Sequence, residues 1–479
     1  METTCVIQKP QKKKQKLNEE DIDENRKSLG NLPEEILRHI LSFLPTTDAV
    51  RTSLLSKRWE YLWDSIPNLH FSDRPISRRK RKGKRSTLFM NFVDRVLCLR
   101  DSSDIKRFTL RCDELHDASR VHTWISAAIK HNVKELYIGL HNFKGEFSLP
   151  CCLFTCKALT SLHLCIPCIL KLPSAVCFSK LQILTINKVT FSDEYLTQQF
   201  FSGLPVLEKL ELNDCCWESL KVVRISAPNL HFLRIHEFVN RNSRYREGCQ
   251  VMIFGGCLKK FHYSGLLFNE YCLYESIKLE KAVISTRAYN PSQQITYCMY
   301  NLLKGLSNVE LLRLSYDEVK VLIHGAELLP HLPMFNNLKN LSFNGSSVDL
   351  DGEALLNILQ RTPCLENLEF FMGISLSSDS EEADRILYPV PSCFSSHLKW
   401  IKVNCYGVEN MLSAIKILLN KAVVLEEIII SSLKHRGGNI DKRMKACKQL
   451  KELPRVSQNC KIVLKWSYYP AGKECEFVL

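Results

Sequence analysis

One short apolar pattern recurs along most of this 479-residue chain. Its form is apolar-x-x-apolar-x-apolar, as in residues 133–138 and 207–212. The spacing between copies runs from 21 residues (258 to 279) to 33 residues (365 to 398). Alternation over so short a run predicts a strand with one buried face, and its recurrence at this spacing indicates a repeat architecture. The copies begin at positions 105, 133, 159, 181, 207, 230, 258, 279, 309, 338, 365, 398 and 425.

The repeated strand predicts a solenoid. A single unit cannot bury its apolar face, so neighbouring units stack on one another. We therefore expect an α/β fold, an irregular leucine-rich-repeat solenoid with a parallel sheet. About thirteen strands at roughly 4.8 Å spacing give a ladder on the order of 60 Å long. The segments between the strands are expected on its convex side, and one of them contains a clear helix with Leu355, Leu356, Ile358 and Leu359, which Pro363 ends. An ordinary α/β domain with buried strands is the alternative, and the number of recurrences disfavours it.

A different pattern occupies residues 31–64, ahead of the repeats. Pro33 suits a helix start and Pro45 a helix end, and apolar residues recur between them at helical spacing. Two more short helical segments are expected before residue 64. The apolar residues of the three segments are Ile36, Leu37, Ile40, Leu41 and Leu44, then Val50, Leu54 and Leu55 on an inner face, then Trp59, Leu62 and Trp63.

This small unit carries more apolar surface than it can bury alone. Three helices in about 35 residues are below the size at which a core usually stands unaided, and a surplus apolar face usually marks an interface. One alternative is that the unit packs against the rest of the same chain. Because the repeats close their own core and a basic linker follows the unit, we expect no mate within the chain.

The pattern LP-x-x-I-x-x-x-I-x-x-x-LP, followed by S-x-x-SKRW-x-x-LW, resembles an F-box. The matching residues are Leu32, Pro33, Ile36, Ile40, Leu44, Pro45, Val50, Ser53, Ser56, Lys57, Arg58, Trp59 and Trp63. The resemblance implies docking on the Skp adaptor of a cullin-based ubiquitin ligase. The residues it implies for the adaptor interface are Leu32, Pro33, Ile36, Ile40, Leu44 and Trp59, with Arg58 adding polar contacts.

The C-terminal part reads as strand, Gly turn, helix and strand from about residue 396, with a further helix at 441–453 and a final strand from Lys461. It resembles the FBD domain through Leu398, Val403, Gly407, Leu418, Leu419, Ala422, Leu425 and Ile428. From residue 28 onward, the chain thus resembles the plant F-box/FBD/leucine-rich-repeat family. We expect a disordered charged tail at 1–28, an F-box at 29–70, a basic linker at 71–87, a leucine-rich-repeat array at 88–395, an FBD domain capping the array at 396–467, and a tail at 468–479.

The net charge of +14 is concentrated in two runs. Residues 12–16 carry four basic side chains, residues 74–85 carry eight, and neither run contains an acid. Subtracting these twelve charges from +14 leaves +2, so nucleic-acid binding by the array is not expected. The first run is either a nuclear-import signal or a solvated tail. The second is either a nuclear-localisation signal or a contact for an acidic partner, or else a solvated linker. Since neither a signal peptide nor an apolar membrane span is evident, we expect the protein in the nucleus, the cytoplasm or both.

No catalytic constellation stands out. Cys165 and Cys168 form a C-x-x-C beside His163, but a zinc site needs a second pair at suitable spacing. The 21 cysteines are better explained as small buried hydrophobic residues. We therefore expect no enzyme activity, metal or cofactor.

The resemblance implies the substrate-recognition subunit of an SCF-type (Skp–cullin–F-box) E3 ubiquitin-protein ligase. Its F-box would dock on the adaptor, and its array would bind a protein target. Two alternatives remain open: a hormone or small-molecule sensing F-box receptor, and a nuclear scaffold that acts through its basic segments.

Overall fold

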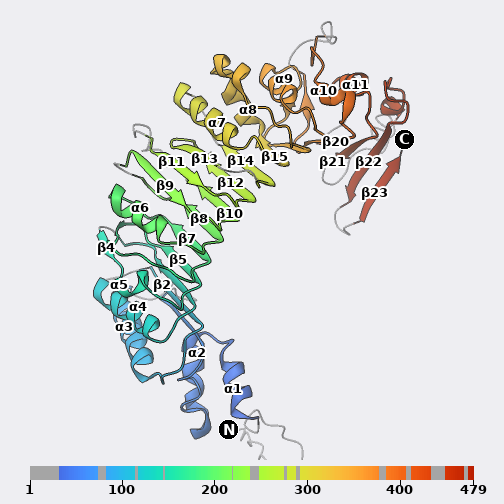
Figure 1. Ribbon diagram of the computed structural model, residues 1–479. Coiled ribbons are helices and arrows are strands. Elements are labelled where there is room, and N and C mark those ends of the chain that lie inside the picture. Colours follow the sequence, from blue (N-terminus) through green and yellow to red (C-terminus); the bar gives the residue numbers. More distant parts are fainter. Residues whose placement is uncertain are drawn as a thin grey trace, which may run out of the picture.

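A curved sheet runs through the whole molecule, with most of the helices along its convex side (Figure 1). It has sixteen strands in the described part of the chain. The computed structural model describes residues 32–73, 82–113, 117–143, 146–217, 220–237, 248–274, 278–286, 292–376, 385–405, 411–432, 448–468 and 473–478. The expected charged tail at 1–28 and most of the basic run at 74–85 lie outside these residues.

Thirteen strands follow the thirteen predicted repeats. Each begins two residues after the first apolar residue of its repeat, and that residue is at most 2% exposed. The prediction of a long parallel-sheet solenoid is confirmed. These strands are β2 (Arg107–Cys112), β3 (Glu135–Leu140), β5 (Ser161–Cys165), β7 (Ile183–Asn187), β8 (Lys209–Asn213), β10 (Phe232–His236), β12 (Lys260–Gly265), β14 (Lys281–Thr286), β15 (Leu311–Ser315), β16 (Asn340–Asn344), β18 (Asn367–Phe370), β20 (Trp400–Cys405) and β21 (Glu427–Ser432).

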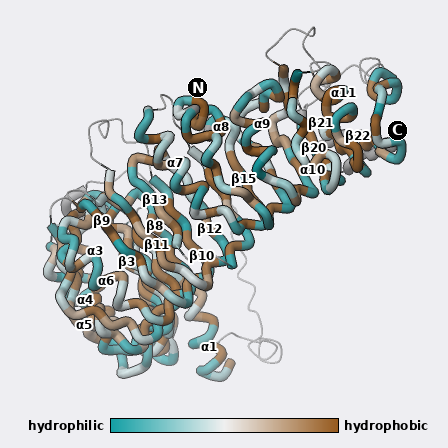
Figure 2. Tube along the Cα trace, turned by 45° about the horizontal axis from the view of Figure 1, so that its top comes forward, coloured by the Kyte–Doolittle hydropathy of each residue, from teal (hydrophilic) through white to brown (hydrophobic). Residues whose placement is uncertain are grey.

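Equivalent positions of neighbouring strands stand side by side. Phe108 pairs with Leu136, and Leu136 pairs with Leu162, so the apolar residue two places into each strand forms a continuous buried row. The residues between these rows face the concave side, and Figure 2 shows the resulting alternation of hydrophobic and hydrophilic positions along the strands. A one-residue slip would turn every apolar side chain outward, which is why the repeats keep this register.

Three more strands extend the sheet beyond the repeats. β1 (Asn68–Ser72) pairs in parallel with β2, where the end of the F-box and a linker were expected. β22 (Lys461–Tyr468) is the expected final strand, and it pairs in parallel with β21. β23 (Lys473–Val478) then runs antiparallel to β22, within the expected C-terminal tail.

The convex side carries helices at both ends of the array and a small second sheet in the middle. The helices are α3 (Lys82–Leu99), α4 (Ala118–Lys130), α5 (Cys151–Phe154), α6 (Glu194–Ser202), α7 (Gln293–Gly305), α8 (Tyr316–Ile323), α9 (Glu353–Gln360), α10 (Ser392–Ser396), α11 (Leu412–Lys421) and the 3-10 helix η5 (Ala326–His331). The small parallel sheet holds β9 (Val222–Ser226), β11 (Gln250–Phe254) and β13 (Glu270–Tyr274). Their β-branched and aromatic residues favour strands over helices.

Four short strands complete the convex side. β4 (Glu146–Ser148) pairs with β6 (Ile169–Lys171), and β17 (Val348–Asp349) pairs with β19 (Ile374–Ser375).

The C-terminal region continues the same solenoid. β20 pairs with β18 and β21 with β20, in the register of the preceding repeats. A separate FBD cap is therefore not distinguished from the array by its strand pairing. The helix expected at 441–453 lies largely outside the described residues.

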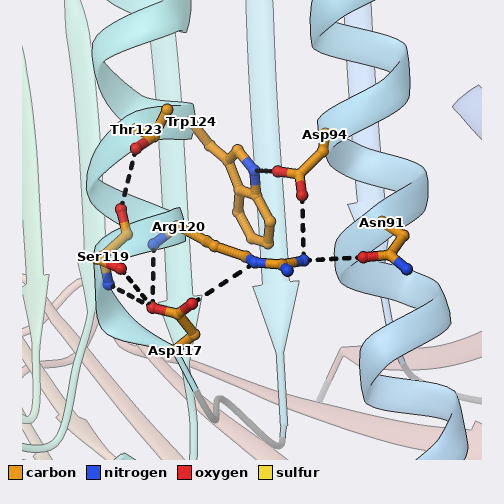
Figure 3. A network of polar contacts seen from close by, with 7 residues as sticks. All are labelled: Asn91, Asp94, Asp117, Ser119, Arg120, Thr123 and Trp124. Carbon is orange, nitrogen blue, oxygen red and sulfur yellow. Dashed lines mark hydrogen bonds and ion pairs between the residues drawn. The ribbon is translucent and has the colours of Figure 1, made fainter.

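A polar network holds α3 against α4 (Figure 3). Arg120 Nη1 lies 3.1 Å from Asp94 Oδ2 and donates to Asn91 Oδ1 at 3.0 Å. Trp124 Nε1 donates to Asp94 Oδ1 at 2.6 Å. Asp117 caps the start of α4 by accepting from backbone N–H groups, and its carboxylate lies 3.5 Å from Arg120 Nε. One carboxylate, Asp94, thus joins the two convex helices next to the N-terminal end of the sheet.

Candidate functional site

Helical segments form in the N-terminal unit where the sequence predicts them, although the second helix is shorter than expected. Pro33 precedes the first turn of the first helix, and Glu34 and Glu35 lie in that turn, where they complement the helix dipole. Pro45 stands in the same position before the second helix. The segments are α1 (Glu34–Leu41), α2 (Thr46–Arg51), and the 3-10 turns η2 (Thr52–Leu54) and η3 (Lys57–Trp59).

One side of these helices packs into the core of the array. Its members are at most 9% exposed, and they form one cluster with Leu69 and Phe71 of β1. The expectation that this unit has no mate within the chain is therefore wrong, because β1 connects it directly to the sheet. The buried residues are Leu37, Leu41, Ala49, Trp59, Leu62, Trp63 and Ile66.

Hydrogen bonds fix the same junction. The buried hydroxyl of Thr46 accepts from the backbone N–H of His70 at 2.7 Å. Arg100, at the end of α3, donates from Nη1 to the carbonyl of Ile66 at 2.7 Å. Burial lowers the pKa of the Arg100 guanidinium, and the nearby Asp101 and Asp64 oppose that shift. The N-terminal helices thus have a fixed orientation relative to the first strands.

Six large apolar side chains of the same N-terminal unit are exposed to water. We call these six residues the F-box apolar face: Ile36 (45% exposed), Phe43 (74%), Leu44 (36%), Leu54 (86%), Leu55 (68%) and Tyr61 (67%). Several large exposed apolar side chains within so short a stretch indicate a site for a protein partner. The charged groups around them pair locally, with Arg51 Nη1 lying 3.0 Å from Asp48 Oδ1. An exposed ion pair of this kind contributes little to stability.

The seven residues implied by the F-box resemblance are placed unevenly. Pro33, Ile36, Leu44 and Arg58 are exposed, and Leu32 and Ile40 are partly buried. The Arg58 guanidinium donates to the carbonyl of Leu32. Trp59 is the exception, since it is only 9% exposed and belongs to the chain's own core. The expectation that Trp59 buries against an adaptor is therefore corrected, because its indole already packs inside the chain.

Sequence reasoning missed four members of the F-box apolar face. Leu54 and Leu55 were expected on the inner face of a second helix, but that helix ends at Arg51 and continues as a 3-10 turn. The tighter turn of a 3-10 helix rotates the following residues off the inner face. Phe43 and Tyr61 were not singled out, although two unmatched aromatic residues in so short a stretch could have been a signal.

A second candidate surface is the concave face of the sheet. Here Arg111 lies over the ring of Tyr137, with 4.9 Å from its guanidinium carbon to the ring centroid. His163, on the neighbouring strand β5, stacks against the ring of Tyr137, with ring centroids 4.5 Å apart. Asn187 Nδ2 lies 2.9 Å from His163 Nε2, and Asn213 Nδ2 donates to Asn187 Oδ1 at 2.7 Å. Burial lowers the pKa of His163, so its neutral ring can accept the Asn187 bond.

The two cysteines of the C-x-x-C and nearby Cys156 are buried, whereas Cys151, Cys152 and Cys177 are exposed. Cys156, Cys165 and Cys168 are each at most 8% exposed. Burial raises the pKa of the Cys168 thiol to about 12, which keeps it protonated. Among the described residues, no group of three or more His, Cys, Asp and Glu side chains is placed to hold a metal ion.

The described helices include none that is both long and apolar enough to cross a lipid bilayer.

Comparisons with known proteins agree with this architecture. The F-box domain family matches residues 29–71, and the At1g61320/AtMIF1 LRR domain family matches residues 96–463, more than half of the chain. The F-box/LRR-repeat protein At3g59210 of Arabidopsis thaliana is 31% identical over 92% of this chain and 95% of that protein.

Two more Arabidopsis thaliana proteins show the same relationship. The F-box/LRR-repeat protein At1g06630 is 33% identical over 72% of this chain and 84% of its own length. The putative F-box/FBD/LRR-repeat protein At3g59240 is 29% identical over 91% of this chain and 89% of its own length. With an N-terminal F-box and a matching leucine-rich-repeat domain, the chain belongs to the F-box/LRR-repeat protein family.

Proposed function

We propose that this chain is the substrate-recognition subunit of an SCF-type E3 ubiquitin-protein ligase. The observation that carries the proposal is the F-box apolar face, which holds six large apolar side chains in water at the N-terminal end of the array. Removing apolar surface from water gains roughly 25 cal/mol per Å², so a partner that covers this face binds favourably. The family resemblance names that partner as the Skp adaptor.

The adaptor contacts that we propose are chosen by exposure. Leu32, Pro33, Ile36, Ile40, Leu44 and Arg58 remain candidates for adaptor contact, and Phe43, Leu54, Leu55 and Tyr61 join them as exposed residues. Trp59 instead supports the interface from inside, because it is 9% exposed and belongs to the core cluster that also includes Leu37 and Leu41.

The array would contribute position and no chemistry of its own. A target held on the array raises the effective concentration of its lysines near a ubiquitin-loaded enzyme recruited by the cullin and RING subunits. The fixed junction supports this role. The bonds from His70 to Thr46 and from Arg100 to Ile66 keep the F-box and the first strands in one orientation. Such a subunit would act in the nucleus, the cytoplasm or both.

Reconstitution of the ligase tests the proposal. The full chain is purified with a Skp adaptor, cullin and RING subunit, and ubiquitin transfer to the chain itself is measured. Leu54→Asp places a charge on the most exposed residue of the F-box apolar face and is expected to abolish transfer. The control is Tyr195→Asp, on a 67% exposed residue of α6. If both variants retain full transfer, the F-box apolar face is not the docking surface.

A further inference from the structure

Five neighbouring strands of the concave face carry no acidic side chain, and the first four of them, β10, β12, β14 and β15, carry basic ones. β10, β12, β14, β15 and β16 follow one another in the sheet, and their residues include no Asp or Glu. The strands on either side each carry an acid, Glu211 in β8 and Glu369 in β18. We call five side chains of these strands the basic band: Arg234, Lys260, His262, Lys281 and Arg313. His236 of β10 is left out, because its Nδ1 lies 3.1 Å from Asp214 Oδ1.

Strand register brings the basic band together. Lys260 pairs directly with Lys281, one strand apart. Arg234 pairs with His262, and Arg313 lies in the same row, separated from His262 by Val283. These residues alternate with buried ones, so they share the concave side of the sheet. The near-neutral charge of the array as a whole hides this local concentration.

Most of the basic band is left without counter-charges. Arg234 Nη1 lies 3.4 Å from Glu211 Oε1. By contrast, Lys260, Lys281 and Arg313 have no carboxylate within 4.0 Å among the residues that the structure describes.

Acids outside the strands do not neutralise the band. Glu280 and Glu310 each come one residue before a strand, at one edge of the sheet. Glu280 is already engaged there, with its Oε1 3.4 Å from Lys259 Nζ.

Two buried nitrogens in the band are also unsatisfied. Within the described part of the chain, His262 Nε2 and Arg313 Nε are buried without a hydrogen-bond partner. The Arg313 guanidinium lies over Phe371, 4.7 Å from the ring centroid, and His262 meets the edge of Phe232 at 5.2 Å between centroids. Like charges placed directly opposite one another on a sheet are destabilising, and unpaired buried polar atoms add to the cost. An anionic partner would relieve both.

We propose that the basic band binds an extended, Asp- and Glu-rich segment of the target protein. This inference rests on the proposed function, because it names the chemistry of the target. The band crosses β10, β12, β14 and β15, so its three inter-strand gaps of about 4.8 Å span roughly 14 Å, which matches about four residues of extended peptide. The flanking acids, Glu211 and Glu369, end the positive surface on both sides. Such a short bounded band suits a peptide better than a nucleic-acid backbone, which needs a continuous positive track.

Peptide binding to the full chain, purified with its adaptor, tests the inference. The probe is a fluorescent peptide of alternating Asp and Glu, and its anisotropy gives the dissociation constant. The double variant Lys260→Glu/Lys281→Glu is expected to weaken binding by about tenfold or more. The matched control is Lys106→Glu/Lys461→Glu. It makes the same change in net charge on exposed lysines at the two ends of the sheet, and is expected to leave the affinity nearly unchanged.

Further arms separate the possible outcomes. A Lys-rich peptide should bind the Lys260→Glu/Lys281→Glu variant more tightly than the wild type. Equal weakening by both double variants, or no binding of the acidic peptide by the wild type, would overturn the inference. The inference would also be overturned if single-stranded DNA bound the wild type as tightly as the peptide does and lost affinity in the Lys260→Glu/Lys281→Glu variant. Adaptor binding is measured on the same samples, and its absence would count against the proposed function while leaving the peptide result readable.

Discussion

Ile36 and Leu37 are neighbours in α1, but Ile36 is 45% exposed and Leu37 is fully buried. Successive residues of an α-helix point about 100° apart, so one turn can serve two surfaces. Leu37 faces the core that continues into β1, and Ile36 faces water on the F-box apolar face. This division separates residues that hold the fold from residues that are free to bind a partner.

Leu37→Ala and Ile36→Ala should therefore differ in stability. Deleting the buried Leu37 side chain leaves a cavity, and we expect the free energy of unfolding to fall by about 2–5 kcal/mol. Truncating the exposed Ile36 side chain should change the free energy of unfolding by less than about 0.5 kcal/mol. Urea denaturation followed by circular dichroism measures both. Equal losses in the two variants would contradict the division of α1 into a core side and a partner side.

Trp59→Ala tests the corrected role of the F-box tryptophan. Because Trp59 is 9% exposed and lies in the core cluster, we expect it to lose about 3–5 kcal/mol of stability. Tyr61→Ala, at a 67% exposed neighbour, serves as the control and should melt close to the wild type. A Trp59→Ala protein that keeps its melting temperature but loses adaptor binding would return Trp59 to the interface.

The repeat strands could be predicted because their signal is local. Each apolar-x-x-apolar-x-apolar unit needs only its own six residues, and parallel neighbours then stack in one register. The ends of the array could not be predicted as well. The residues of β1 resemble the end of the F-box in sequence. Their role as a strand depends on pairing with β2, in which Leu69 pairs with Phe108, 39 residues later in the chain.

The candidate surfaces were harder still to predict. The exposure of Leu54 depends on a change from α-helix to 3-10 turn at Thr52, which helical periodicity does not reveal. The basic band depends on the strand register that pairs Lys260 with Lys281, which lies 21 residues later in the chain. The net charge of the array as a whole is close to zero, so its composition suggested a neutral surface.

Asp94→Ala should loosen the contact between α3 and α4. The substitution leaves the buried Trp124 indole N–H without its acceptor and removes the carboxylate beside Arg120 (Figure 3). We expect a loss of about 1–3 kcal/mol and faster amide hydrogen exchange in α4. Asp94→Asn keeps an acceptor oxygen for Trp124 and should lose less. If the two substitutions are equally mild, the network does not hold the helices together.

Acid pH should weaken the concave stack. Burial holds the pKa of His163 below its ordinary value of 6.5, and Arg111 lowers it further while Glu211 opposes the shift. The unfolded chain takes up this proton first as the pH falls below about 6.5, so the stabilising contribution is present above that pH and is lost towards the lower folded pKa. Burial also lowers the pKa of His70 and His262.

Melting temperatures between pH 7.5 and pH 5 check this dependence. His163→Gln is expected to remove part of the decline, because Gln can accept the Asn187 bond without titrating. His231→Gln, at an exposed position before β10, should leave the decline as in the wild type. Identical pH profiles for all three proteins would show that His163 does not contribute.

The affinity for a purified Skp adaptor tests the central claim most directly. Isothermal titration compares the wild type with Phe43→Asp/Leu54→Asp on the F-box apolar face, and with Tyr195→Asp/Val423→Asp at exposed apolar residues of the array. We expect the first variant to raise the dissociation constant by about a hundredfold or more and the second to leave it within about threefold. Tight binding by the Phe43→Asp/Leu54→Asp protein would contradict docking through this face.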